Sequence, residues 1–363
     1  MTTDPPAGLR PAPGAPHLDS PPSAAPSVAA SVPSGATPAV PKAATISDVA
    51  RAAGVSVGTV SRVLNGHADV KPALGEAVRA AVAQLGYRRN SAAAQLRRGS
   101  RITVALLVED VADPFYSHLH RAVEEAALRN NWALLVASTS ASAERTRTQI
   151  EVLASQGIHA LIGALPHDLP VAELRAALEP RTPIVLVDRP EQLEADAVIS
   201  NNRGAARQAT EHLLDLGHAR VACLLDRHAL YTSEERAAGY RDAMSARGLA
   251  IDERLIAWRD SHWDPVGVLA AMLALDTPPT ALFTGNNRVT VESLQAQREL
   301  GARLEQVGFD DVELAELLTP PLSVIAQDPS ELGRVAAERV AARLAGDVGP
   351  SAVFTVPARL VVR

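Results

Sequence analysis

Short apolar runs alternate with longer amphipathic segments along most of this chain. The runs are ITVALLV at 102–108, ALLVAS at 133–138, IHALIGA at 158–164, PIVLVD at 183–188, AVIS at 197–200, RVACLL at 220–225, TALFTG at 280–285 and LSVIAQ at 322–327. Segments between them, such as SHLHRAVEEAALRNN, repeat their apolar residues at helical spacing. This alternation predicts parallel sheets covered by helices on both faces. Because residues 102–363 exceed what one such sheet usually needs, we expect two similar α/β lobes with a cleft between them.

A different pattern precedes the lobes, because residues 45–88 indicate three short helices. Thr45 and Asp48 resemble a capping box at the first helix, and Gly54 is expected to end it. Ser56 is suited to cap the second helix, and Pro72 lies in the first turn of the third. Two helices joined by a short turn that contains glycine predict a helix-turn-helix.

The second of these helices has two contrasting faces. Its apolar stripe, Val60, Val63 and Leu64, is expected to face a small core. The outward face carries short side chains, one long cation and no acid: Ser56, Val57, Ser61, Arg62 and Asn65. Gly58 lies within the helix at a cost of about 1 kcal/mol relative to alanine. Such a face can approach base edges in the major groove, where phosphates would repel an acid, so it favours DNA binding over a plain three-helix bundle.

Charge and composition divide the chain further. Residues 1–44 hold 11 of the 26 prolines and are expected to be disordered, with no legible function. Residues 45–101 contain nine Lys or Arg and three acidic residues, although the whole chain has a net charge of −6. A basic segment attached to an acidic body indicates a head that binds a polyanion.

Several classes of protein are disfavoured by what the sequence lacks. There is no apolar run of 18 residues and no secretory signal pattern, so we expect a cytoplasmic protein. The single cysteine, Cys223, lies in an apolar run and is expected to be a buried strand thiol. The chain has no phosphate-binding glycine motif and no HExxH motif, and its ten histidines are scattered. We therefore expect no enzymatic activity, no cofactor and no metal site.

The segment TISDVARAAGVSVGTVSRVLNG at 45–66 closely resembles the DNA-binding head of the LacI/GalR family of transcriptional repressors. The resemblance continues through VKPALGEAVRAAVAQLGYRRNSAAAQLRRG and the body motifs ADPFY, PIVLVDR, NNRGA, EHLLDLGH, SEERAAGYRDAM, VGFDD and PPLSVIAQDPSELGRVAAERV. It covers roughly residues 45–363 and implies a small all-α helix-turn-helix headpiece followed by a bilobal α/β body that resembles periplasmic sugar-binding proteins.

The resemblance implies the following domains. After the tail at 1–44 come the headpiece at 45–89, a hinge helix or linker at 90–101, and a body for ligand binding and dimerisation at 102–363. Lobe 1 is expected to comprise residues 102–200 and 329–350, and lobe 2 residues 201–328 and 351–363.

For the headpiece, the family pattern implies two sets of DNA contacts. The base-reading residues would be Ser56, Val57, Gly58 and Arg62, with Arg62 suited to guanine and Val57 to a thymine methyl group. Residues near phosphates would be Thr45, Thr59, Ser61, Asn65 and Tyr87. In the hinge, which starts at Asn90, Leu96 would wedge into the minor groove with Ala93 on the same approach. A plain linker whose arginines make loose electrostatic contacts is the alternative.

For the body, the resemblance implies a ligand site at the carboxyl ends of the parallel strands. The residues matched by motif are Asp113, Phe115, Asp188, Arg236 (at the start of a helix), Trp263, Asn286 and Asp310. Carboxylates, an amide and a guanidinium beside aromatic rings suit a polyhydroxylated ligand.

The sequence departs from the family pattern at Lys71, Arg89, Asn201 and Asn287. The two asparagines stand where aspartates are common, which leaves open whether the ligand is the usual monosaccharide. No leucine-heptad tail follows TVPARLVVR, so the resemblance implies a two-fold homodimer.

The expected function is a repressor that binds double-stranded operator DNA and is switched by a small-molecule effector, a sugar. The alternative is a cytoplasmic sugar-binding or enzyme-like α/β protein whose head binds DNA without specificity. A periplasmic transport receptor and a nucleoid-type DNA binder are disfavoured, because the first would need a signal peptide and the second would not need a cleft.

Overall fold

The computed structural model describes residues 46–64, 71–85, 101–188, 190 and 195–363. The chain divides into two compact units, Met1–Ser91 and Ala92–Arg363. The predicted tail and most of the predicted hinge lie outside the described residues. No helix among the described residues is long and apolar enough to cross a membrane.

The headpiece contains the three expected helices, α1 (Ile46–Ala52), α2 (Val57–Leu64) and α3 (Pro72–Gln84). They enclose a small core of Val49, Ala50, Val60, Val78 and Ala81. Gly54 has a φ of 65°, and the Val55 amide donates to the Ala50 carbonyl at 3.0 Å, which closes α1 as predicted. Lys71 precedes α3 without a side-chain cap bond, and Pro72 starts the helix.

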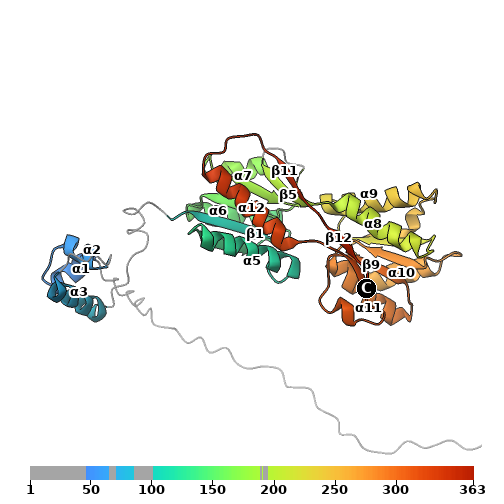
Figure 1. Cartoon of the computed structure of the whole chain (residues 1–363), viewed down its shortest axis with the longest axis horizontal. Coiled ribbons are helices and arrows are strands. Elements are labelled where there is room, and N and C mark those ends of the chain that lie inside the picture. The colour runs from blue at the N-terminus through green and yellow to red at the C-terminus, as the bar shows by residue number, and fades with distance from the viewer. Residues whose placement is uncertain (1–45, 65–70, 86–100, 189, 191–194) are drawn as a thin grey trace, which may run out of the picture. The chain divides into compact units, whose positions relative to one another are not determined.

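Lobe 1 is built on a six-stranded sheet with the order β11-β5-β4-β3-β1-β2. Its strands are β1 (Thr103–Val108), β2 (Ala133–Ser138), β3 (Ala160–Gly163), β4 (Ile184–Val187), β5 (Asp196–Ser200) and β11 (Val353–Val356), all parallel to their neighbours. Helices α5 (Pro114–Arg129) and α12 (Pro329–Leu344) cover one face, and α6 (Ala143–Ser155) and α7 (Val171–Ala177) cover the other (Figure 1).

Strand β1 shows why the sheet needs helices on both sides. Val104, Leu106 and Val108 pack towards α5 and α12, whereas Ala105 and Leu107 pack towards α6 and α7. All five side chains are fully buried. Successive residues of a strand point to opposite faces, so a run that is apolar throughout can be buried only between two layers.

Lobe 2 repeats this architecture with the strand order β12-β10-β9-β8-β6-β7. Its strands are β6 (Val221–Leu225), β7 (Ile256–Trp258), β8 (Ala281–Thr284), β9 (Glu305–Phe309), β10 (Ser323–Ala326) and β12 (Arg359–Val361), of which β12 alone is antiparallel. Helices α8 (Asn202–Asp215) and α9 (Tyr231–Ala246) cover one face, and α10 (Pro265–Leu273) and α11 (Asn287–Leu300) the other. Two short 3-10 helices, η1 (Glu253–Leu255) and η2 (Ala315–Leu317), complete the lobe.

The prediction for the C-terminal segment was wrong in part. We expected residues 351–363 in lobe 2, but Val353–Val356 pairs with β5 in the sheet of lobe 1, and only β12 joins lobe 2. The segment before β11 is held by Asp196, whose carboxylate accepts from the Ala352 amide at 2.9 Å. Strand pairing between residues about 150 positions apart leaves no local pattern in the sequence.

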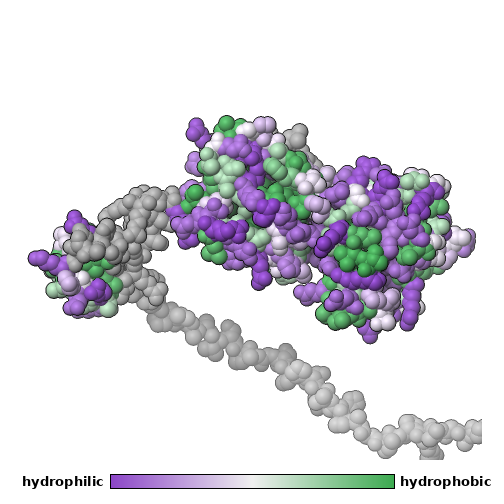
Figure 2. All heavy atoms as spheres, viewed as in Figure 1, coloured by the Kyte–Doolittle hydropathy of each residue, from purple (hydrophilic) through white to green (hydrophobic). Residues whose placement is uncertain are grey.

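The predicted fold class, an α-helical headpiece and a two-lobed α/β body, is confirmed. The eight apolar runs all form strands, and Cys223 is fully buried in β6. Strands β7, β9, β11 and β12 were not among the predicted runs. The space-filling view shows a largely hydrophilic surface with apolar areas on both lobes (Figure 2).

Candidate functional site

The outward face of α2 exposes the residues that we expected to contact DNA bases. Ser56, Val57, Gly58 and Arg62 are exposed, whereas Val60 is fully buried on the opposite face. Arg62 makes no ion pair with any described residue. A Cβ at Gly58 would meet only the Ser56 hydroxyl, at 3.6 Å, so a longer side chain has room there.

Ser56 and Thr59 are tied to each other at the start of α2. The Ser56 hydroxyl accepts from the Thr59 amide at 3.1 Å, and the two hydroxyls lie 2.9 Å apart. This is the predicted cap of the second helix. The remaining predicted DNA contacts, namely Thr45, the side chain of Ser61, Asn65, Tyr87, Asn90, Ala93 and Leu96, lie outside the described residues.

The body carries a polar pocket between its two lobes. It is lined by Glu109, Asp113, Phe115, Tyr116, Ala164, Asp188, Asp226, Leu230, Thr232, Arg236, Asn286, Asn287, Arg288, Asp310 and Gln327. Six of the seven predicted ligand-site residues are among them. The lining residues follow the carboxyl ends of strands in both sheets, where the sequence placed the site.

Two of the aspartates that line the pocket have a positive backbone φ. Asp188, after β4, has a φ of 59°, and Asp310, after β9, has a φ of 70°. L-residues rarely adopt this region, and aspartate tolerates it better than most. Such conformations concentrate at functional sites, so the two aspartates are candidates for ligand contacts.

Asp310 is buried, and its pKa is raised because burial outweighs the nearby Arg236 and the hydrogen bonds from Gln327 and the Asn287 amide. Arg236 is 5% exposed, donates to Asn202 at 2.9 Å and stacks 3.7 Å from the centre of the Phe309 ring. Burial lowers its pKa, while Asp310, Asp188 and Asp226 oppose that shift. Contrary to our expectation, Arg236 does not start a helix, because α9 already begins at Tyr231 and Arg236 lies in its second turn.

The amino terminus of α11 supplies much of the lobe 2 wall. Asn286 caps the helix by accepting from the Val289 amide at 2.9 Å, and its amide group donates to Asp226 at 2.8 Å. Asn287 donates to Asp113 of lobe 1 at 3.0 Å. Asp113 also caps α5 by accepting from the Phe115 amide at 3.0 Å. Asn286 and Asp113 thus cap the amino termini of α11 and α5 and also line the pocket.

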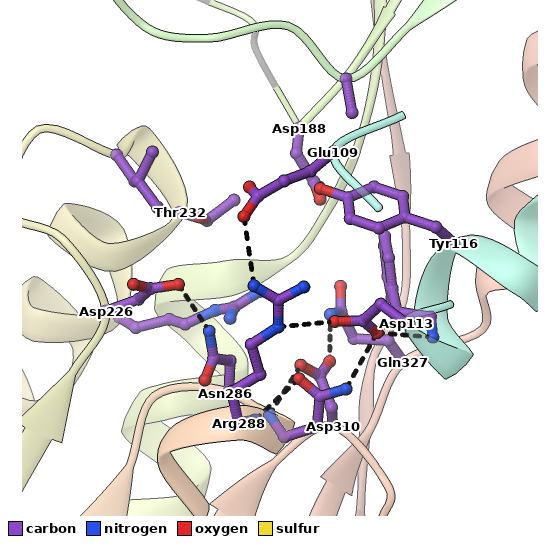
Figure 3. A pocket seen from close by; sticks show the side chains of 15 residues that line it. Glu109, Asp113, Tyr116, Asp188, Asp226, Thr232, Asn286, Arg288, Asp310 and Gln327 are labelled. Atoms are coloured by element: carbon purple, nitrogen blue, oxygen red, sulfur yellow. Dashed lines mark hydrogen bonds and ion pairs between the residues drawn. The ribbon is translucent and has the colours of Figure 1, made fainter. Parts of the chain in front are cut away.

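Two arginines of lobe 2 form ion pairs with carboxylates of lobe 1, and one of them, Arg288, lines the pocket. Arg288 donates to Asp113 at 3.1 Å and to Glu109 at 3.3 Å, and it lies 3.6 Å from Asp110. Arg227 donates to Glu109 at 3.1 Å. Figure 3 shows the Arg288 guanidinium in the pocket, linked to both Glu109 and Asp113.

Trp263 is the predicted residue that the structure does not bring to the pocket. It packs with Met272 and Val289 beneath α10 and α11, and its indole nitrogen donates to Glu292 at 2.7 Å. A partly buried indole N–H needs an acceptor, and Glu292 provides it. The aromatic side chains at the pocket are instead Phe115 and Tyr116, which pack edge to face.

Sequence reasoning missed several lining residues, and a signal existed for some of them. Glu109, Asp226 and Gln327 directly follow apolar strand runs, so the strand-end rule that selected Asp188 would have found them. Arg288 had no such signal, because the second residue of a helix carries no pattern that points to another lobe. Asn201, one of the two asparagines that depart from the family pattern, caps α8, and the other, Asn287, faces the site.

The pocket has little free space of its own. Its volume is about 70 Å³, and beside it lies an outer cavity of about 500 Å³ that shares Phe115, Asn287, Asp310 and Gln327. Five carboxylates and two guanidinium groups line the inner pocket. Within the described part of the chain, no group of three or more acidic, histidine or cysteine side chains is placed to hold a metal ion.

Comparison with known proteins agrees with both halves of this description. Residues 45–90 match the family model "Bacterial regulatory proteins, lacI family", and residues 210–363 match a periplasmic binding protein-like domain. The ribose operon repressor of Haemophilus influenzae is 31% identical over 309 residues, covering 83% of this chain and 92% of that protein.

Two solved structures show similar folds. The transcriptional regulator CelR–cellobiose complex has a TM-score of 0.66 at 30% identity and covers 88% of this chain and 99% of that one. The lac repressor dimer bound to operator and the anti-inducer ONPF has a TM-score of 0.72 at 26% identity and covers 89% of this chain and 98% of that one. With a curated relative above 30% identity along most of both chains, this protein belongs to the lacI family of bacterial regulatory proteins.

Proposed function

We propose that this protein is a transcriptional repressor that binds a pseudo-palindromic operator as a homodimer and acts by binding alone, without catalysis. The observation that carries the proposal is the combination of two features in one chain. The body has a polar pocket between its two lobes, and helix α2 of the headpiece has an exposed face without acidic residues. The relatives point the same way, since the ribose operon repressor and the lac repressor are both repressors by name.

In the headpiece, the proposed base contacts are Arg62 and Val57. Arg62 is exposed and makes no ion pair with a described residue, so its guanidinium is available for guanine. Gly58 lets the helix approach the groove closely and reads no base itself. The Ser56–Thr59 pair fixes the helix start against the phosphates.

The proposed effector is a neutral polyhydroxylated compound, a sugar, held between the lobes. Carboxylates accept hydrogen bonds from hydroxyl groups, Arg236 and Asn286 donate them, and Phe115 offers an apolar face. The excess of carboxylates over guanidinium groups disfavours a phosphorylated ligand. The similar CelR structure contains cellobiose, which supports this class.

The proposed switch couples the pocket to the operator. Effector binding changes how the lobes meet, which alters the dimer and, through the hinge, the order of the segment that Leu96 belongs to. Because coupling between two binding sites is reciprocal, the effector changes operator affinity by the same factor as the operator changes effector affinity.

The proposed dimer uses apolar surface of the body. Leu314 and Leu317, in the connection between β9 and β10, are 67% and 70% exposed, and Leu318 is 38% exposed. A cluster of exposed leucines in one short segment suits a protein interface. The similar lac repressor structure is described as a dimer, which supports a dimer but not a particular surface.

Gel-shift assays with DNA upstream of the gene, with and without a panel of neutral sugars, test the proposal. We expect one fragment to shift specifically and one sugar class to change its affinity. A shift that depends only on salt and ignores every sugar would contradict the operator switch.

Two variants of α2 locate the contacts. Arg62→Ala should weaken specific binding by about 1–3 kcal/mol and relax preference at one base pair. A longer side chain has room at position 58, so Gly58→Gln should fold normally. It should alter operator preference if position 58 faces the bases. Arg51→Ala is the control, because Arg51 pairs with Asp48 on α1.

A further inference from the structure

The guanidinium of Arg288 occupies the space between the lobes that a ligand would need. Its three nearest carboxylates, Asp113, Glu109 and Asp110, all belong to lobe 1, whereas Arg288 lies in the first turn of α11 in lobe 2. Figure 3 shows this side chain reaching across the pocket rather than lying along its wall. Arg288 therefore makes contacts that exist only while the lobes are together.

These ion pairs are partly shielded from solvent. The side chains of Asp113, Glu109 and Arg288 are 8%, 20% and 32% exposed. Exposed pairs contribute little, because water and salt screen them, but shielded pairs with hydrogen bonds contribute more. The contacts can thus bias the equilibrium between closed and open lobes.

The free volume of the pocket also indicates that Arg288 and a sugar cannot both fit there. The pocket leaves about 70 Å³, less than half of a cavity of ~150 Å³ that holds one benzene molecule. A sugar ring with its hydroxyl groups is larger than benzene. For such a ring to bind among these carboxylates, the Arg288 side chain has to leave.

We propose that Arg288 is an internal ligand of the effector site: its guanidinium binds the lobe 1 carboxylates, holds the lobes closed and competes with the effector. This inference rests on the proposed effector site. The inference adds a requirement for the effector. The part of the effector that replaces Arg288 has to present hydrogen-bond donors or a positive charge to Asp113 and Glu109, and no anionic group.

The consequence for regulation is specific to this chain. Closure of the lobes does not require effector, because Arg288 already supplies cross-lobe contacts. The effector exchanges one closed arrangement for another. Its apparent affinity is the intrinsic affinity multiplied by the fraction of molecules in which Arg288 has left the site.

The distance between the lobes tests the proposal without DNA or effector. Spin labels at Glu124→Cys on α5 and Gln295→Cys on α11, both exposed positions, report that distance by double electron–electron resonance. Native Cys223 does not interfere, since it is fully buried and burial raises its pKa. The full chain is used throughout.

Arg288→Met replaces the guanidinium side chain with an unbranched apolar one and so removes the charge. We expect its distance distribution to move to longer values and widen relative to the parent chain. Arg227→Met, which removes one cross-lobe ion pair to Glu109, should give a smaller shift in the same direction. Arg203→Met is the matched control, because Arg203 pairs with Asp242 within lobe 2 and should leave the distribution unchanged.

Chemical rescue completes the test. Methylguanidinium at millimolar concentration should restore the narrow, short distribution of Arg288→Met, while sodium chloride at the same ionic strength should not. If Arg288→Met and Arg203→Met give the same distribution, the proposal is wrong. If Arg288→Met opens the lobes but methylguanidinium does not close them, the internal-ligand assignment is wrong. Neither result depends on whether an operator or effector is found.

Discussion

Two clusters of arginines and carboxylates, at opposite ends of the lobe 1 sheet, have similar chemistry and different consequences. The amino-end cluster joins Asp196 at the start of β5 to Arg339 and Arg343 on α12, at 2.8 and 2.7 Å. The cross-lobe cluster joins Asp113 and Glu109 of lobe 1 to Arg288 of lobe 2, at 3.1 and 3.3 Å.

The partners of the amino-end cluster all belong to one packed lobe. Asp196 is 2% exposed, and it also accepts from the Ala352 amide, while Arg343 donates to the Pro350 carbonyl at 2.9 Å. The cluster thus fastens α12, β5 and the segment before β11 to one another. Its ion pairs are expected to break only when that part of lobe 1 unfolds.

The partners of the cross-lobe cluster belong to two separately packed lobes. They can separate while each hydrophobic core remains intact, so their loss changes conformation rather than folding. An ion pair therefore affects stability or switching according to whether other contacts hold its partners together.

Removing the charge of Asp196 should have the largest effect. Asp196→Asn leaves two largely buried arginines short of an anion and should lower the free energy of unfolding by roughly 2–3 kcal/mol. The loss is smaller than for an isolated buried pair, because Arg339 keeps Asp347 and Arg343 keeps backbone carbonyls. Urea unfolding followed by circular dichroism measures it. A variant as stable as the parent would remove the distinction between the two clusters.

The pH dependence provides an internal check on that prediction. Although burial opposes it, hydrogen bonds from Arg343 and Arg339 hold the pKa of Asp196 below its ordinary value of 3.8. A depressed pKa stabilises the fold above the unfolded value, and that contribution is lost as the pH falls through the folded value. The stability difference between the parent and Asp196→Asn should therefore be constant at neutral pH and shrink below about pH 4.

A smaller effect, on binding rather than stability, is expected for Asp188→Asn. Asparagine tolerates the positive φ at this position, so the backbone should persist. If Asp188 accepts hydrogen bonds from the effector, the effector concentration for a half-maximal change in operator affinity should rise at least about tenfold, or ~1.4 kcal/mol. Fluorescence anisotropy with labelled operator measures it, with an unchanged urea midpoint as the control.

The smallest effect is expected for Arg203→Met. Arg203 and Asp242 form a bidentate pair at 2.7 and 2.9 Å, with geometry as good as that of either cluster, but their side chains are 53% and 37% exposed, more than those of either cluster's central carboxylates. Solvent and salt screen such pairs, so the unfolding midpoint should not change measurably. A clear loss of stability would mean that solvent exposure does not weaken this ion pair.

Much of the fold could be predicted from the sequence because its signals are local. Apolar runs give strands, Gly54 and Pro72 mark helix ends, and residues that follow strands, such as Asp188 and Asn286, reach the site. Each of these signals acts between residues a few positions apart, where periodicity and capping chemistry are legible.

The rest depended on how distant segments meet. Arg288 bonds to Asp113 across 175 positions of the chain, and β11 pairs with a strand far before it. Trp263 was expected at the site, but its indole N–H donates to Glu292 and the residue does not line the pocket. Local patterns in the chain are thus enough to predict the headpiece, the two α/β lobes and the edge of the sheets where the site lies. Which charges face each other there depends on how distant segments pack, because an ion pair requires proximity in space and leaves no period in the chain.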